Sequence, residues 1–144
     1  MAKYNLKEKK EKNVHYRSRI RAELVDNLYN LILRKIVIEK KYRDPDYSAR
    51  QLAKDLGTNT RYVSAVIGLR FDDNYMGLVN EYRIKDACYL LKDKRYDELT
   101  MEDIGTMVGY NRRQSFYVAF YRKMGKSPLS YRREFQERKA NEIS

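Results

Sequence analysis

The sequence is poor in the residues from which most catalytic and metal sites are built. It holds one histidine, His15, in a charged N-terminal stretch, and one cysteine, Cys88, in an apolar stretch. No Cys/His cluster has zinc spacing, no glycine-rich phosphate loop is present, and Asp44 and Asp46 lack the following oxygen ligands of a calcium loop. A lone cysteine forms no intramolecular disulfide, which suits a reducing cytoplasm. The sequence therefore predicts a protein that is not an enzyme and uses no cofactor or metal.

Glycine and proline are also scarce, with 6 and 2 residues in a chain of 144. No apolar run approaches the roughly 18 residues of a membrane span, and the basic N-terminus lacks the apolar segment of a secretory signal. Hydrophobic residues make up 42% and charged residues 35% of the chain, as in folded globular proteins. Because the apolar residues recur at helical spacing, the sequence predicts a single all-α domain with no membrane contact.

Charge is distributed unevenly along the chain. The formal net charge is +11, from 31 basic and 20 acidic residues. Residues 1–22 and 105–139 are strongly basic, whereas residues 71–104 are acidic on balance. A surplus of positive charge that is confined to two zones indicates a polyanionic partner and a basic binding face. A membrane surface is the less favoured partner, because no basic amphipathic segment with an apolar stripe is evident.

The N-terminal part divides into an arm and a helix. Residues 1–19 are predicted to form a flexible basic arm, which either contacts phosphates beside a binding site or keeps the protein soluble. A helix is predicted over residues 20–41, ending before Asp44-Pro45-Asp46 turns the chain. We expect its apolar stripe to pack on the unit that follows; the stripe consists of Leu24, Leu28, Leu31, Ile32 and Ile36. The alternative is a dimer through this helix, with contacts from Tyr29, Leu33 and Val37.

Residues 47–71 carry the pattern of a helix-turn-helix unit. Ser48 is a predicted N-cap, and Gln51 three residues later fits a capping box. Gly57 is placed to end the first short helix in the left-handed region, and a second helix begins near Asn59. Two short helices joined by a glycine turn are the signature of this motif. The inner faces of the two helices are Leu52, Ala53, Leu56, Val63, Val66 and Ile67.

The same pattern returns over residues 100–124, with Thr100 as N-cap and Asp103 three residues on. Gly105 stands in the place of Ala53, where two helices are expected to pack closely. The repeat has an offset of 52 residues before the turn and 53 after it, so the second turn is one residue longer. The matching pairs are Leu52 and Ile104, Leu56 and Val108, Gly57 and Gly109, Val63 and Phe116, Val66 and Ala119, and Ile67 and Phe120.

A longer helix joins the two units. Residues 75–92 have the apolar spacing of a helix about 25 Å long, a rigid strut, and another helix is predicted over residues 128–139. The expected fold is all-α, with two helix-turn-helix subdomains joined by a long linker helix and an additional N-terminal helix. Residues 20–144 together form the predicted DNA-binding domain.

Over about residues 47–135 the chain resembles the AraC/XylS family of bacterial transcription regulators. Tyr82-Arg83-Ile84 with Ala87, Leu90 and Leu91 is similar to the family's linker helix. The chain departs from the family pattern at Gly105, where alanine is usual, and at Asp72, where glycine is frequent. The resemblance is densest in Asp103-Ile104-Gly105, Val108-Gly109-Tyr110, Gln114-Ser115-Phe116, Phe120-Tyr121-Arg122-Lys123 and Gly125-Lys126-Ser127-Pro128-Leu129-Ser130-Tyr131-Arg132. It implies an AraC-type DNA-binding domain without the effector domain that many relatives carry.

The second helix of each unit is expected to read DNA bases. In a helix-turn-helix this helix enters the major groove, and its early residues meet base edges. Arg61 and Arg113 can each donate two hydrogen bonds to guanine, and Gln114 can pair with adenine. The predicted base-reading set is Arg61, Ser64, Ala65, Arg113, Gln114, Tyr117 and Val118. The resemblance points to the same three positions in the first unit.

A second set is expected to contact phosphates. Arg112 lies at a helix start, and helix N-terminal amides near Asn59 and Thr100 are placed for anions. Lys126 either contacts phosphate or belongs to a loop that caps the recognition helix. The predicted phosphate set is Asn59, Thr60, Thr100, Asn111, Arg112, Ser115 and Lys126.

The sequence thus predicts a sequence-specific, double-stranded DNA-binding transcription regulator of the bacterial cytoplasm, located at the nucleoid. A monomer is expected ahead of a dimer, and RNA polymerase is the further partner expected of an activator. One alternative is a single-stranded nucleic acid or RNA binder that uses some of the 14 tyrosines for stacking, although most fall at core spacing. The other alternative is a protein-interaction module with incidental basic ends. Preference for one duplex over bulk duplex separates these functions.

Overall fold

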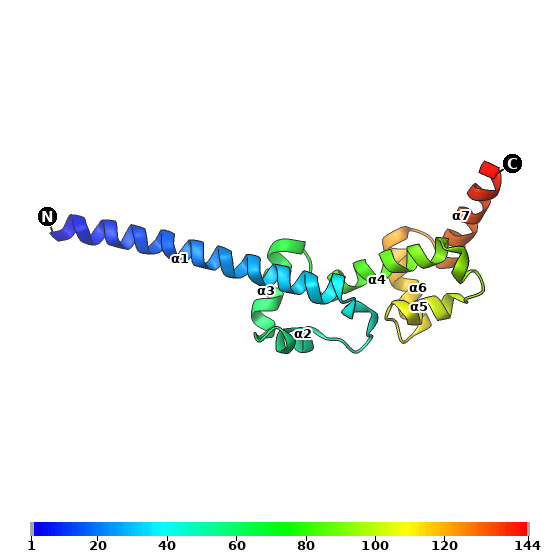
Figure 1. The fold of residues 1–144 in the computed structure, drawn as a ribbon, viewed down its shortest axis with the longest axis horizontal. Helices are drawn as coiled ribbons and strands as arrows, with labels where there is room; N and C mark the ends of the chain where they lie inside the picture. Colours follow the sequence, from blue (N-terminus) through cyan, green and yellow to red (C-terminus); the bar gives the residue numbers. More distant parts are fainter. Residues whose placement is uncertain (1, 144) are drawn as a thin grey trace.

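The computed structural model describes residues 2–143, with side chains from residue 8 onward. Every regular element in this range is helical, which confirms the predicted fold class. Two compact units lie at the two ends of one helix, and the N-terminal helix projects from the first unit away from the second (Figure 1). The elements are α1 (Ala2–Leu33), η1 (Arg34–Ile38), η2 (Lys41–Arg43), α2 (Ala49–Asp55), α3 (Thr60–Phe71), α4 (Tyr75–Lys92), η3 (Lys94–Tyr96), α5 (Met101–Val108), α6 (Arg113–Met124) and α7 (Pro128–Ile143).

Each helix-turn-helix unit has its own hydrophobic core. Val63 and Ile67 of α3 are fully buried in the first core, and Phe116 and Phe120 of α6 are fully buried in the second. Helix α4 belongs to both, because its first half packs into one core and its second half into the other. It contributes Leu78 and Val79 to the first core and Ile84, Ala87, Leu90 and Leu91 to the second. The predicted linker helix is thus a shared wall of both units.

Helix α1 is longer at its N-terminus than the sequence analysis predicts. It begins at Ala2, so residues 2–19 are helical where a flexible arm was expected. Residues 2–22 contain neither glycine nor proline and are rich in lysine, glutamate and arginine, which favour helix. At the other end Lys40 has a left-handed φ of 55°, so the helical run stops at Ile38 instead of residue 41. The arm residues Lys3 and Lys7 lie outside the side chains that the structure describes.

The C-terminal part of α1 packs on the first unit, as predicted, but through a rotated face. Leu24 and Leu31 of the predicted stripe are 61% and 41% exposed, whereas Ile32 and Ile36 are fully buried. The partly buried side chains that pack beside them are Val25, Leu28, Tyr29 and Val37. The rotation follows from contacts with the end of α3, where the Tyr29 and Phe71 rings lie 5.2 Å apart. Tyr29 and Val37, assigned to the dimer alternative, are therefore occupied within the chain.

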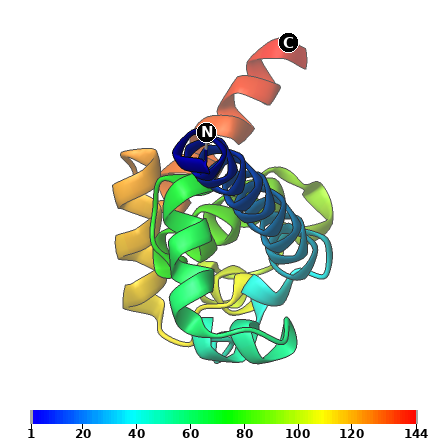
Figure 2. The ribbon, with the colours of Figure 1, turned by 90° about the vertical axis from the view of Figure 1, so that its left-hand side faces the viewer.

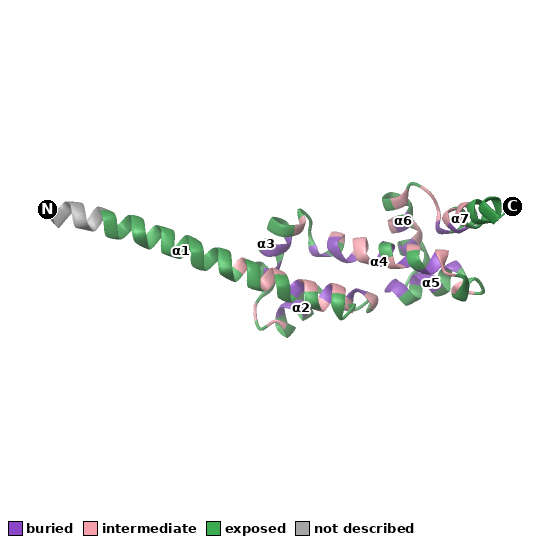
Figure 3. Ribbon diagram, turned by 45° about the horizontal axis from the view of Figure 1, so that its top comes forward, coloured by how far each residue is buried: buried purple, intermediate pink, exposed green. Residues whose placement is uncertain are grey.

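Beyond this packed part, α1 is exposed on all sides from residue 8 to residue 24 (Figure 3). No helix within residues 2–143 combines the length and the apolar character needed to cross a membrane. The same residues contain no group of histidine, cysteine, aspartate or glutamate side chains arranged to hold a metal ion.

Side-chain caps fix where the short helices begin. The Thr100 side chain accepts from the Asp103 amide at 3.1 Å, and Asp103 accepts from the Thr100 amide at 3.0 Å, a complete capping box. At Ser48 only half of the predicted box forms. The hydroxyl accepts from the Gln51 amide at 3.1 Å, but the Gln51 side chain donates to Asp55 at 2.8 Å instead of reaching back.

The two turns differ by one residue, as the repeat offsets predict. Gly57 and Gly109 both have positive φ, 68° and 115°, as expected for glycines that end a helix. The next helix has Asn59 as its N-cap in the first unit but Arg112 in the second. Asn111, 52 residues after Asn59, is therefore one residue short of the capping position that Asn59 holds in the first unit.

The close helix packing predicted at Gly105 is also confirmed. A Cβ atom at this position would lie 2.8 Å from Cδ2 of Phe116, which is fully buried. Because such a ring has little room to move, glycine lets α5 approach α6 more closely than alanine would.

Candidate nucleic-acid interface

Helix α3 presents the predicted base-reading residues of the first unit. Its N-terminus is fixed by Asn59, whose side chain accepts from the Tyr62 amide at 3.0 Å. Arg61, Ser64 and Ala65 are exposed, while the inward face of the helix is buried in the first core. Arg61 makes no ion pair or hydrogen bond with the described residues, so its guanidinium is available to an external acceptor.

Helix α6 presents the corresponding residues of the second unit. Gly109 in the turn before α6 and Gly125 at its end both have positive φ, and α6 buries Phe116 and Phe120. Gln114 is exposed, and Val118 is 50% exposed. An exposed valine on this face could pack on a thymine methyl group.

The two helices are roughly parallel and lie on the same side of the molecule (Figure 2). They are separated along α4 by the length of the linker, one in each unit (Figure 1). This arrangement follows from α4, because each half of that helix is buried in the core that also holds α3 or α6.

Arg113 belongs to a small surface cluster. Its guanidinium lies 3.2 Å from a carboxylate oxygen of Glu102 and 5.1 Å from the centre of the Tyr117 ring. Interaction with Tyr117, followed by the charge of Glu102, raises the pKa of Arg113. Tyr117 is partly buried and packs edge-on against Phe116. The structure thus places Tyr117 as a support for Arg113 rather than as a freely exposed side chain.

The predicted phosphate contacts fall into two groups. Thr60, Asn111, Arg112 and Ser115 are exposed at or near the start of a recognition helix. The exposed Asn59 and Thr100 side chains already accept as helix caps, and the Thr100 amide donates to Asp103, so neighbouring amides at these helix starts are the donors placed to meet an anion.

Lys126 differs from the expectation that it meets phosphate freely. It is partly buried and forms an ion pair with Glu134 of α7. Ser127 accepts from the Ser130 amide at 3.1 Å, so this loop caps the start of α7. Gly125 ends α6, and its amide donates to the Tyr121 carbonyl at 2.8 Å, so the loop also caps the recognition helix, as in the alternative weighed for it above.

The sequence analysis missed exposed apolar and aromatic side chains on both recognition helices. Tyr62 and Leu69 of α3 are 61% and 72% exposed, and Tyr121 of α6 is 62% exposed. Tyr121 lines a surface hollow with Tyr117 and Val118. Helical spacing could have found Tyr62 and Leu69, because residues seven apart share a face and neither position repeats the core pattern.

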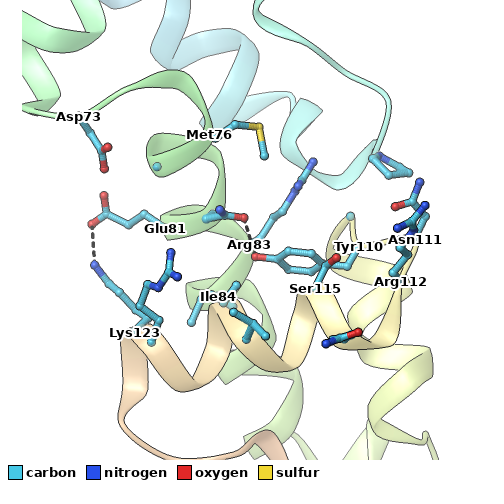
Figure 4. A pocket seen from close by; sticks show the side chains of 18 residues that line it. Asp73, Met76, Glu81, Arg83, Ile84, Tyr110, Asn111, Arg112, Ser115 and Lys123 are labelled. Carbon is cyan, nitrogen blue, oxygen red and sulfur yellow. Dashed lines mark hydrogen bonds and ion pairs between the residues drawn. The ribbon is translucent and has the colours of Figure 1, made fainter.

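A groove of about 710 Å³ runs between α4 and α6 (Figure 4). Arg112 and Gln114 line it, so it belongs to the same face as the predicted DNA contacts. On one wall Lys123 lies 3.9 Å from Glu81. Deeper in, the Tyr110 hydroxyl donates to Asn80 at 2.8 Å and ties the second unit to α4.

Two helix-turn-helix units, parallel recognition helices and a shared linker helix define a double helix-turn-helix DNA-binding domain. Among solved structures, the C-terminal domain of AraT, a response regulator from Geobacillus stearothermophilus, aligns with 28% identity and a TM-score of 0.64, over 72% of this chain and 84% of that one. The C-terminal domain of the two-component response regulator yesN from Fusobacterium nucleatum aligns with 23% identity and a TM-score of 0.60, over 77% and 96%. A DNA-binding transcriptional dual regulator from Escherichia coli K-12 aligns with 17% identity and a TM-score of 0.60, over 70% and 86%.

The helix-turn-helix domain family matches residues 52–134, which is more than half of the chain. The chain therefore belongs to the AraC-type helix-turn-helix family of DNA-binding transcription regulators, which is not an enzyme family. No curated protein matches the chain significantly. The family resemblance drawn from the sequence is thereby confirmed.

Proposed function

We propose that the chain regulates transcription by binding one specific duplex DNA site with both recognition helices. Each helix would occupy one of two successive major-groove segments on the same face of the DNA. The observation that carries this proposal is the parallel arrangement of α3 and α6 on one side of the molecule (Figure 2). One monomer then suffices to fill a site. Contact with RNA polymerase, location at the nucleoid and the direction of regulation stay predictions.

Base reading is assigned to the exposed side chains of the two helices. Arg61 has no partner among the described side chains and can donate both hydrogen bonds to a guanine. Arg113 exchanges Glu102 for a base edge, and an exposed ion pair of this kind contributes little that must be given up. Gln114 reads an adjacent adenine. Ser64, Ala65 and Val118 complete the surface with a hydroxyl and apolar contacts, and Tyr117 holds the Arg113 side chain over the groove.

Phosphate contacts fix the register of the domain on DNA. Arg112 at the start of α6 supplies charge, while backbone amides at the starts of α3 and α5 supply donors. Thr60, Asn111 and Ser115 lie beside these helix starts and add uncharged contacts. Lys126 is left out of this set, because Glu134 neutralises it.

Footprinting on the site selected from a random duplex library tests the bipartite arrangement. We expect protection of two segments about 34 Å apart, or one helical turn, on one face of the DNA. The site should be asymmetric, because Arg61 and Ser64 differ from Arg113 and Gln114. A palindromic site that is filled only by dimers would contradict the proposal.

Two neighbouring arginines separate base reading from charge. Arg113→Ala is expected to cost about 1–3 kcal/mol of binding free energy and to relax preference at one base pair. Arg112→Ala should weaken binding to all DNA sequences alike. It should also reduce by about one the slope of the logarithm of the binding constant against the logarithm of salt concentration. Affinities for the selected site, for its single-base variants and for random duplex decide the assignment. Equal losses on specific and random DNA in both variants would remove Arg113 from base reading.

A further inference from the structure

A buried arginine of α4 links the segment around η2, residues 41–44, to the second unit. Arg83 lies near the middle of α4 and is only 5% exposed. Its Nε donates to the Tyr42 carbonyl at 2.7 Å, and a terminal nitrogen donates to the Asp44 carbonyl at 3.2 Å. The guanidinium also lies 5.2 Å from the centre of the Tyr110 ring, which belongs to the second unit. Figure 4 shows this side chain extending from α4 toward the segment around η2.

A second clamp holds the same segment one turn further along α4. Two nitrogens of Arg43 donate to the two carboxylate oxygens of Asp86, at 2.7 and 2.9 Å. The Tyr42 hydroxyl donates to the same carboxylate at 2.8 Å. Burial and the Asp86 contact raise the pKa of Tyr42 to about 12, so at neutral pH the hydroxyl keeps its proton and the bond. Paired geometry of this kind resists rotation better than a single bond does.

The second unit presses on this segment directly. A Cβ atom built on Gly109 would lie 2.3 Å from the Tyr42 carbonyl oxygen and 2.7 Å from Nε of Arg83. Only a residue without a side chain permits this approach. The segment η2 is therefore wedged between α4 and the end of α5. We call Tyr42, Arg43, Arg83, Asp86 and Gly109 the joint.

We propose that the joint fixes the orientation of α6 relative to α3, with Arg83 as its positioning residue, and thereby selects the spacing of the two DNA half-sites. This inference rests on the proposed two-helix binding. Two linked modules gain about 10²–10⁴-fold in affinity when both engage, and lose that gain when their geometry does not match the sites. Helix α4 sets the distance between the units, and the joint resists rotation of the second unit about it.

The DNA test compares the full chain with Arg83→Met and with the milder Asp86→Asn. The probes are the selected duplex, the same duplex with one base pair inserted or deleted between the half-sites, and each half-site alone. We expect Arg83→Met to bind the duplex with native spacing about tenfold more weakly than wild type does. It should bind each half-site as wild type does and lose most of its preference for the native spacing. Asp86→Asn should reduce the preference for the native spacing over the altered spacings by a smaller factor. Arg95→Met is the matched control, because it breaks an exposed arginine–aspartate pair outside the joint.

Equal losses on half-sites and on the full site would give Arg83 a merely structural role and overturn the inference. An unchanged spacing preference in a folded Arg83→Met protein would overturn it too. If wild type itself binds a half-site as well as the full site, the proposed function fails instead.

The joint can also be tested without DNA. Spin labels at Arg50→Cys in α2 and Thr106→Cys in α5, in a Cys88→Ser background, report the distance between the units, since both sites are exposed. We expect a narrow distance distribution with Arg83 present and a broader one with Arg83→Met or Asp86→Asn. Equal widths would overturn the inference.

Discussion

Gly109→Ala is expected to lower the free energy of unfolding by about 3–5 kcal/mol. Two costs add at this position. The φ of 115° strains any residue with a Cβ atom, and the new atom would collide with the Tyr42 carbonyl oxygen. That oxygen is backbone and is already bound by Arg83, so it has no cheap way to move. Urea unfolding followed by circular dichroism measures the loss.

Gly57→Ala provides the matched control. Gly57 ends the equivalent helix of the first unit with a φ of 68°, but no atom lies within 4 Å of its missing Cβ. It should therefore show the backbone cost alone, about 1–2 kcal/mol. The difference between the two variants reports the contact between the units together with the extra backbone cost of the larger φ at Gly109. Similar losses would mean that the second unit does not press on η2 in solution.

Deletion of residues 1–19 is expected to leave the fold intact. If three arm cations contact phosphates, the slope of the logarithm of the DNA-binding constant against the logarithm of salt concentration should become shallower by about three. The packed part of α1 begins near Val25, so the deletion removes no core residue. Because α1 points away from the second unit, its contacts should fall beyond the half-site read by α3 (Figure 1). The footprint should then shorten at that end alone.

Charge removal without deletion separates phosphate contact from solubility. Lys9, Lys10 and Lys12 changed together to glutamine keep helix-forming residues and should reproduce most of the change in slope. The control removes Arg133, Arg138 and Lys139 from α7 in the same way. An unchanged slope after deletion would assign the arm to solubility, and a loss of folding would show that the domain begins earlier than residue 20.

Much of the fold was readable from the sequence because its signals are local. The glycine turns at Gly57 and Gly109, the Thr100 capping box and the apolar spacing of residues 75–92 each act over a few residues. The repeat offset even located the extra residue that makes Arg112 the N-cap of α6. Exposure of Arg61 and Gln114 followed from the same periodicity.

Other features depend on partners far along the chain. The sequence alone could not predict that the buried face of α1 is centred on Ile32 and Ile36. The choice of face is set by contacts with the end of α3, about forty residues later in the chain. Nor could it bring Arg43 to Asp86 or the Tyr110 hydroxyl to Asn80, pairs that lie 43 and 30 residues apart in the sequence.

The sequence by itself thus determined the double helix-turn-helix and its family, and it predicted which helix faces are exposed for DNA contact, since helical periodicity, caps and glycine turns are encoded over short stretches. The tertiary structure alone decided how the two units are held relative to each other. That geometry depends on Arg83, which the sequence marks as part of the linker-helix pattern but not as a buried residue. Its burial is stable only because the chain folds back to bring the Tyr42 and Asp44 carbonyls within hydrogen-bonding distance, and no local pattern encodes that approach.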